Sequence, residues 1–140
     1  APRRDATAYE ALRDRAGELG RPAVVVHTLG TRRDFGARQA FVTNLLAAGG
    51  ISAVQEGAKV AILASSRAGY AEHGASAIEA LRAAGVDTVL VAGRASELGD
   101  SAGAVDGEVH DGIDVAAFLS DVLDRLTPPR DAGTTTEGSR

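Results

Sequence analysis

The sequence contains no cysteine, no methionine and no tryptophan, and its only lysine is Lys59. Without cysteine the chain has no disulfide, no thiolate nucleophile and no cysteine-based metal site, which is typical of a cytoplasmic protein. The lack of methionine, together with Ala1 as first residue, leads us to expect an internal or C-terminal piece of a longer protein. No apolar run approaches the roughly 18–20 residues that span a bilayer, so no membrane partner is expected.

Charge and composition describe an ordinary globular domain. The 140 residues are 44% hydrophobic and 24% charged, and the formal net charge is −4. This length suits one domain with a buried core. A net negative charge disfavours a dedicated nucleic-acid-binding protein, which usually presents a basic face.

Short apolar runs rich in β-branched residues alternate with segments whose apolar residues recur at three- and four-residue spacing. The first pattern is typical of strands buried on both faces of a parallel sheet, and the second of amphipathic helices. The predicted strands are 23–26, 51–55, 60–64, 88–91 and 106–110, and the predicted helices lie near 7–19, 40–48, 70–84 and 113–126. The alternation predicts an α/β fold with a doubly wound parallel sheet, flavodoxin-like (Rossmann-like), in strand order 2-1-3-4-5.

The predicted organisation has three parts. Residues 1–22 are assigned to a linker and an N-terminal helix, 23–127 to the α/β domain, and 128–140 to a disordered tail too polar to bury a core. A loop of small residues is predicted at 95–104, and the last helix is expected to have its N-cap at Asp111 or Gly112.

One junction does not suit a parallel sheet. The second strand is predicted to end near Gln55 and the third to begin near Lys59, whereas a parallel crossover needs roughly a dozen or more residues. Either the second strand pairs antiparallel as a hairpin, or a crossover helix is missing from the sequence. We favour a missing segment because the apolar strands on both sides are intact, and we expect a break or an overlong link at 56–59.

Ligands of such sheets bind beyond the carboxyl ends of the strands. Two loops follow those ends, 30–36 and 65–70, and their glycines and serines are candidates for cradling a phosphate. Four arginines near the same edge are candidates for holding an anion: Arg32, Arg33, Arg67 and Arg94. No G-x-G-x-x-G or G-x-x-x-x-G-K-[ST] pattern is present, so ordinary turns with a serine cap and solvated arginines are the competing interpretation.

Other titratable residues give no catalytic pattern. The candidates near this edge are His27, Asp34, Tyr70, Glu72, His73 and His110. No pair of histidines has the i, i+4 spacing of a helical zinc site, so no metal is expected. The remaining groups are of a kind that any loop of this fold offers. We therefore expect no catalytic residue in this chain.

Three stretches resemble one known family. They are RPAVVVHTLGTRRDFGARQAFVTNLLAAGGI (21–51), AILASSRAGYAEHGASAIEALRAAGVDTVLVAG (61–93) and VDGEVHDGIDVAAFLSDVLDRL (105–126). Together they resemble the C-terminal, cobalamin-binding-like domain of the small (beta) subunit of methylmalonyl-CoA mutase, over about residues 7–127. The resemblance implies a heterodimer with a catalytic large (alpha) subunit, which interconverts methylmalonyl-CoA and succinyl-CoA with adenosylcobalamin. It also implies a helix between the second and third strands.

The family's cobalamin-binding domains carry Asp-x-His-x-x-Gly on the first loop, and the histidine ligates cobalt. Aligned on the closing Gly36, this chain has Thr31 in place of the aspartate and Arg33 in place of the histidine. A guanidinium stays protonated and has no lone pair to donate. Arg33 therefore cannot ligate cobalt.

Two further cobalamin loops are altered. The family's Ser-x-Leu is Ser65-Ser66-Arg67 here, and its Gly-Gly after the fourth strand is Gly93-Arg94. The resemblance thus implies degenerate loops with three added arginines, whose side chains are expected to fill the channel for the nucleotide tail. No cofactor is expected to bind this domain, although the holoenzyme uses adenosylcobalamin.

These observations favour a non-catalytic, structural domain of the mutase small subunit that folds with and stabilises the large subunit. Two alternatives stay open. One is a genuine cobalamin-binding domain of an acyl-CoA mutase. The other is a stand-alone flavodoxin-like regulatory module that binds an anion or a nucleotide.

Overall fold

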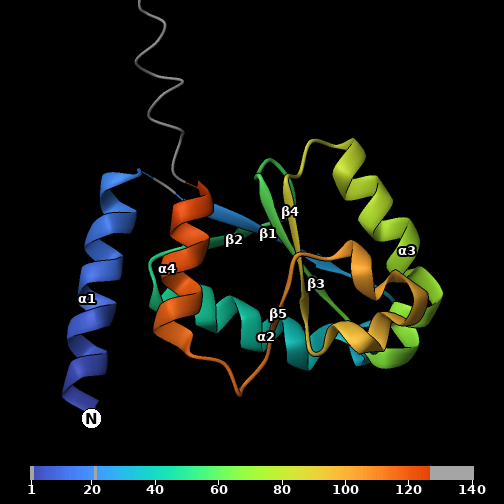
Figure 1. Cartoon of the computed structure of the whole chain (residues 1–140), viewed down its shortest axis with the longest axis horizontal. Coiled ribbons are helices and arrows are strands. Elements are labelled where there is room, and N and C mark those ends of the chain that lie inside the picture. Colours follow the sequence, from blue (N-terminus) through green and yellow to red (C-terminus); the bar gives the residue numbers. More distant parts are fainter. Residues whose placement is uncertain (1, 21, 127–140) are drawn as a thin grey trace, which may run out of the picture.

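The computed structural model of the chain describes residues 2–20 and 22–126, with side chains from residue 9 onward. It contains a five-stranded sheet in the order β2-β1-β3-β4-β5, in which every neighbouring pair is parallel. Helices flank this sheet (Figure 1). The α/β class and the strand order predicted from the sequence are confirmed.

Every observed strand lies within two residues of a predicted one. The strands are β1 (Ala23–Thr28), β2 (Ser52–Val54), β3 (Val60–Ala64), β4 (Thr88–Ala92) and β5 (Gly107–Val109). The helices are α1 (Pro2–Glu18), α2 (Arg32–Ala48), α3 (Arg67–Ala83) and α4 (Val115–Leu126), with a 3₁₀ segment η1 (Ala95–Ala104). Within residues 2–20 and 22–126, every helix is too short or too polar to cross a bilayer. The predicted tail lies outside the described residues.

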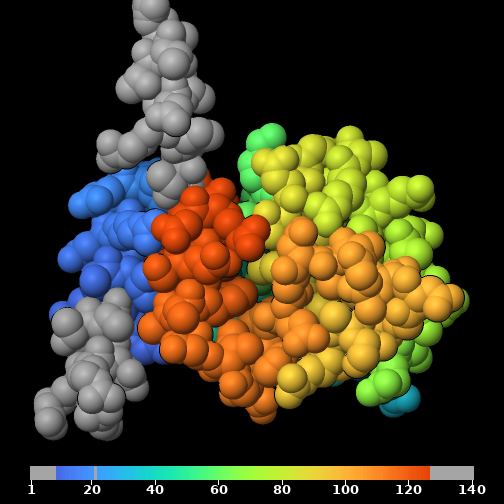
Figure 2. All heavy atoms as spheres, in the orientation of Figure 1, coloured from blue at the N-terminus to red at the C-terminus, as the bar shows by residue number. Residues whose placement is uncertain are grey.

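The sheet separates two hydrophobic cores, because successive side chains on a strand point to opposite faces. On β1, Val24 and Val26 pack with α1, α2 and α4, whereas Val25 packs with α3. β3 and β4 are buried at every position, as expected of central parallel strands. Figure 2 shows α4 against α1 at one end of the molecule and η1 against α3 at the other.

Two helices begin earlier than the sequence predicted, so the loops 30–36 and 65–70 are shorter than expected. α2 begins at Arg32 because the carboxylate of Asp34 accepts a hydrogen bond from the N–H of Thr31 (2.9 Å). α3 begins at Arg67 because the hydroxyl of Ser66 accepts an N–H from the first turn (3.0 Å). Both bonds satisfy backbone donors that a helix start leaves unpaired.

Three other local predictions were wrong. α1 begins at Pro2, where a linker was expected, and proline is tolerated in a first helical turn. Residues 95–104 form η1 and not an irregular loop. α4 is capped by Asp114, whose carboxylate accepts an N–H three residues later (3.0 Å), and not by Asp111 or Gly112.

The junction between β2 and β3 contains neither the antiparallel hairpin nor the break at 56–59 that was expected. Both strands run parallel to β1 and lie on opposite sides of it, and the chain between them is unbroken, so the hairpin and the chain break are both wrong. Val25 pairs with both Val54 and Ala61, so residues 55–59 start and end at nearly the same level along β1. Five residues at about 3.3 Å each suffice to cross two strand spacings of about 5 Å.

Candidate functional site

The carboxyl ends of β1, β3 and β4 form the edge at which parallel sheets bind ligands. Only two or three residues separate each of these strands from the helix that follows it. These short turns bring side chains from α2, α3 and η1 together at one edge. We call this group the carboxyl-end cluster; it consists of Asp34, Arg38, Ser65, Ser66, Tyr70 and Glu97.

Asp34 joins the first two turns of the edge. One carboxylate oxygen accepts hydrogen bonds from the N–H and the hydroxyl of Thr31, both at 2.9 Å. The other accepts the hydroxyl of Ser66 at 2.9 Å. The bonds from Thr31, and then that from Ser66, lower the pKa of Asp34. This carboxylate therefore holds two turns together in its charged form, and it is not poised to take up a proton near neutral pH.

Arg38 lies at the centre of the cluster and was not singled out from the sequence. Its Nη1 donates to the carbonyl oxygens of Ser65 (2.9 Å) and Ala92 (3.2 Å) and to Oε1 of Glu97 (2.7 Å), and its Nη2 lies 3.2 Å from Oε2 of Glu97. The guanidinium also lies over the ring of Tyr70, 5.7 Å from its centroid. Arg38 thus connects the ends of β3 and β4 to η1.

Glu97 is the acidic partner of Arg38 and is only 8% exposed. Burial alone would raise the pKa of Glu97, but the hydrogen bonds from Arg38 and from the N–H of Arg94 (3.1 Å) outweigh it and lower the pKa. A bidentate arginine–carboxylate pair of this kind is among the stronger charged contacts in proteins. Both members are therefore charged and neutralise each other within the cluster.

Tyr70 and Ser65 complete the inner layer of the cluster. The hydroxyl of Tyr70 lies 2.6 Å from the carbonyl oxygen of Ala92 and accepts the N–H of Ser65 at 3.1 Å. The hydroxyl of Ser65 donates to the carbonyl oxygen of Leu29 at 2.8 Å. Burial raises the pKa of the Tyr70 hydroxyl. Both hydroxyls are therefore committed to backbone groups, and neither lies beside a base that would activate it as a nucleophile.

Gly93 lets the cluster close. It has a φ of +110°, and a Cβ at this position would lie 2.7 Å from Nη1 of Arg38 and 2.9 Å from Oε2 of Glu97. The Arg38–Glu97 pair thus occupies the space beside the turn after β4. Any side chain at position 93 would displace it.

The arginines predicted to line this edge lie at its surface. Arg32, Arg33, Arg67 and Arg94 are all exposed. Of the other degenerate loop positions, Thr31 is exposed, Gly36 is half-buried within α2, Ser65 is buried and Gly93 is half-buried. Among the described residues, Arg38 therefore lies within the carboxyl-end cluster, and the four predicted arginines lie exposed around it.

The three histidines lie apart. His27 is half-buried on β1, and burial lowers its pKa. The Nε2 of His73 lies 3.7 Å from Glu72, and that of His110 lies 3.7 Å from Glu108. Across residues 2–20 and 22–126, no group of three histidine, aspartate or glutamate side chains is placed to hold a metal ion.

Sequence reasoning missed Arg38 and Glu97 because nothing in their spacing links them. They are 59 positions apart, on a helix and on a segment predicted as a loop. The one local signal is that Glu97 stands three residues after Arg94, the spacing of a capping box. Pairing with Arg38 depends on the strand order, which brings α2 beneath the end of β4.

Comparison with known proteins identifies relatives of the chain. No protein-family model matches it. A methylmalonyl-CoA mutase small subunit of Propionibacterium freudenreichii subsp. shermanii is 36% identical over 143 aligned residues, which cover 88% of this chain and 22% of the relative. A methylmalonyl-CoA mutase small subunit of Streptomyces virginiae is 36% identical over 145 aligned residues, covering 89% of this chain and 23% of the relative.

The alignments have two consequences. First, 88% of this 140-residue chain is about 123 residues, about 20 fewer than the 143 aligned positions, so the relative has about 20 residues without a counterpart here. Second, the chain spans less than a quarter of the length of these relatives. As the resemblance predicted, the chain is related to the methylmalonyl-CoA mutase small subunits and corresponds to a part of such a subunit.

Proposed function

We propose that this chain is a non-catalytic domain of the small subunit of a methylmalonyl-CoA mutase, and that it stabilises the large subunit that carries the adenosylcobalamin chemistry. The relationship to small subunits supports the assignment to a small subunit, and it supports the role toward a large subunit because a small subunit implies a larger partner. The observation that carries the non-catalytic assignment is the Arg38–Glu97 pair, which occupies the edge where this fold binds ligands.

The residues of the edge do not fit cobalamin. Arg33 stands where the resemblance places a cobalt-ligating histidine, and a guanidinium has no lone pair to donate. Behind it, Arg38 bridges the carbonyl oxygens of Ser65 and Ala92. A nucleotide tail entering between these strands would break both bonds and leave Glu97 buried without its partner, which is strongly unfavourable.

Co-expression with the large subunit tests the structural role. We expect the chain to co-purify with a mutase large subunit and to raise its melting temperature. A chain carrying Leu119→Asp, which places a charge in a fully buried position, serves as the misfolded control. A large subunit that is equally stable and active without the chain would contradict the proposal.

Titration with hydroxocobalamin, followed by the visible absorbance spectrum, separately tests whether the chain binds cobalamin. We expect no spectral change with the unmodified chain or with the Thr31→Asp/Arg33→His variant, because Arg38 still fills the edge. Micromolar binding by the unmodified chain, with the spectrum of a protein nitrogen ligand, would instead favour a genuine cobalamin-binding domain.

A further inference from the structure

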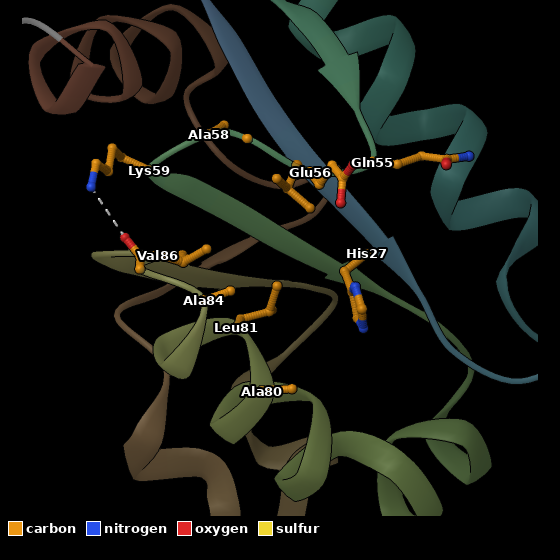
Figure 3. A pocket seen from close by; sticks show the side chains of 12 residues that line it. His27, Gln55, Glu56, Ala58, Lys59, Ala80, Leu81, Ala84 and Val86 are labelled. Atoms are coloured by element: carbon orange, nitrogen blue, oxygen red, sulfur yellow. Dashed lines mark hydrogen bonds between the residues drawn. The ribbon is translucent and has the colours of Figure 1, made fainter.

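A groove runs along the α3-side face of β1, away from the carboxyl-end cluster. It encloses about 380 Å³ and lies between the β2–β3 link, β1 and the C-terminal part of α3. Its lining includes Val25 and His27 of β1, Ala80 of α3 and its C-cap Ala84, and residues 55–59 (Figure 3). We call it the β1 groove.

The handedness of parallel crossovers shows why this groove exists. The chain moves along the sheet in one direction from β1 to β2 through α2, and in the opposite direction from β3 to β4 through α3. The step from β2 to β3 has the same direction as that from β3 to β4. Because such crossovers are right-handed in nearly all proteins, a helix between β2 and β3 belongs on the α3 side, beside α3. The β1 groove lies at that place.

The lengths of the alignments match this missing element. The relatives have about 20 residues with no counterpart in the chain, and a parallel crossover takes roughly a dozen residues or more. The β2–β3 link is the one parallel connection among the described strands that contains no helix or 3₁₀ segment. We therefore place the missing residues between Val54 and Val60.

The chemistry of the groove defines what fits it. On the side of α3 its lining consists of Ala80, Leu81, Ala84 and Gly85, and the three small residues among them allow another helix to approach closely. Its floor is the apolar Val25, and its rim carries the charges of Glu56 and Lys59. Among the described residues no large hydrophobic side chain is exposed. The complementary surface is thus a narrow stripe of small and medium aliphatic side chains flanked by polar residues.

We propose that the β1 groove is an acceptor site for one amphipathic helix supplied by another polypeptide, lying alongside α3 as the crossover helix of the relatives would. The proposal rests on the groove and on the alignment lengths, and it is independent of the role toward cobalamin or the large subunit. The contact is small, and the free helix must lose conformational entropy on binding. Weak association, with a dissociation constant on the order of 10⁻⁴ M, is therefore expected.

A peptide provides the first test. The probe is a synthetic peptide with the Propionibacterium sequence that aligns opposite the link, titrated into the ¹⁵N-labelled chain. We expect amide shifts at Val25, His27, Ala80 and Ala84. Ala84→Arg should abolish them by filling the groove, whereas Ala83→Arg, an exposed position of α3 outside the groove, should leave them unchanged. A peptide of the same composition in scrambled order is the control for the sequence.

A graft provides the second test. Replacing residues 56–58 with the same segment should raise the melting temperature by several degrees, since the helix then binds without loss of translational freedom. The graft should also abolish the shifts caused by the free peptide. The proposal is overturned if the graft folds without gaining stability and the peptide causes no shifts. Shifts at these residues that depend on the concentration of the chain itself would also overturn it, because they would identify a second copy as the occupant.

Discussion

Arg38 is the residue on which the carboxyl-end cluster depends. Changing it to methionine keeps the aliphatic stem but leaves Glu97, 8% exposed, without its bidentate partner. Because a buried acceptor that loses its partner costs more than the bond itself was worth, we expect a loss of about 2–3 kcal/mol in the free energy of unfolding. Urea denaturation measures it, with Arg33→Met at an exposed position as the control.

Removing both charges of the Arg38–Glu97 pair should have a different effect from removing one of them. The double variant Arg38→Met/Glu97→Gln should be more stable than Arg38→Met alone, because the unpaired charge is gone. A double variant whose loss equals the sum of the two single losses would show that the two side chains act independently.

The lowered pKa of Glu97 makes the free energy of unfolding depend on pH. Its pKa is lower in the folded chain than in the unfolded one, so the unfolded chain takes up this proton first as the pH falls. The contribution of Glu97 is thus complete above its unfolded pKa of about 4.3 and is lost as the pH falls through the lower folded value. We expect Glu97→Gln to flatten the decline of unfolding free energy below about pH 5. Glu79→Gln, at an exposed position of α3, should keep the full decline.

At the scale of elements, α1 tests whether apolar burial or charge holds a helix in place. Leu12 is 7% exposed and packs in the core shared with α2 and α4. Arg15 forms an ion pair with Asp124 on α4, but both side chains are partly exposed. Since an exposed ion pair contributes little, we expect Leu12→Ala to cost about 3 kcal/mol and Arg15→Ala less than about 1 kcal/mol. Thermal and urea unfolding of both variants measure these losses in the free energy of unfolding. A larger loss for Arg15→Ala than for Leu12→Ala would show that charge holds α1 in place.

At the scale of the whole molecule, the two faces of the sheet are unequally covered. Three helices pack on one face, whereas α3 and η1 cover the other, and β2 is a three-residue edge strand with Ser52 and Ala53 exposed. Amide hydrogen exchange should therefore be slowest in β3 and β4 and fastest, among the strands, in β2. Protection at Val54 equal to that at Ile62 would contradict the expected difference between the edge strand and the central strands.

The apolar pattern of the sequence predicted the strands of the sheet but not the starts of the helices at its carboxyl edge, for a physical reason. The runs around Val24, Ile62 and Val89 predicted the strands because burial on both faces leaves no polar alternation to misread. The starts of α2 and α3 were missed because they depend on side chains that cap from outside the apolar pattern. Asp34 is a candidate acid or base by its residue type, yet its bonds to Thr31 and Ser66 give it a structural role.

The sequence by itself determined the α/β class, the strand order and the shortage of residues between β2 and β3, since these follow from local apolar patterns and chain length. Only the tertiary structure decided which arginine fills the edge and which arginines surround it. It also decided that a link of five residues crosses β1 between parallel strands. Both outcomes depend on contacts between segments far apart in the chain, such as Arg38 with Glu97 or Val25 with both of its neighbours. The spacing of residues along the chain does not indicate such contacts, because the partners meet only when the strands assemble into the sheet.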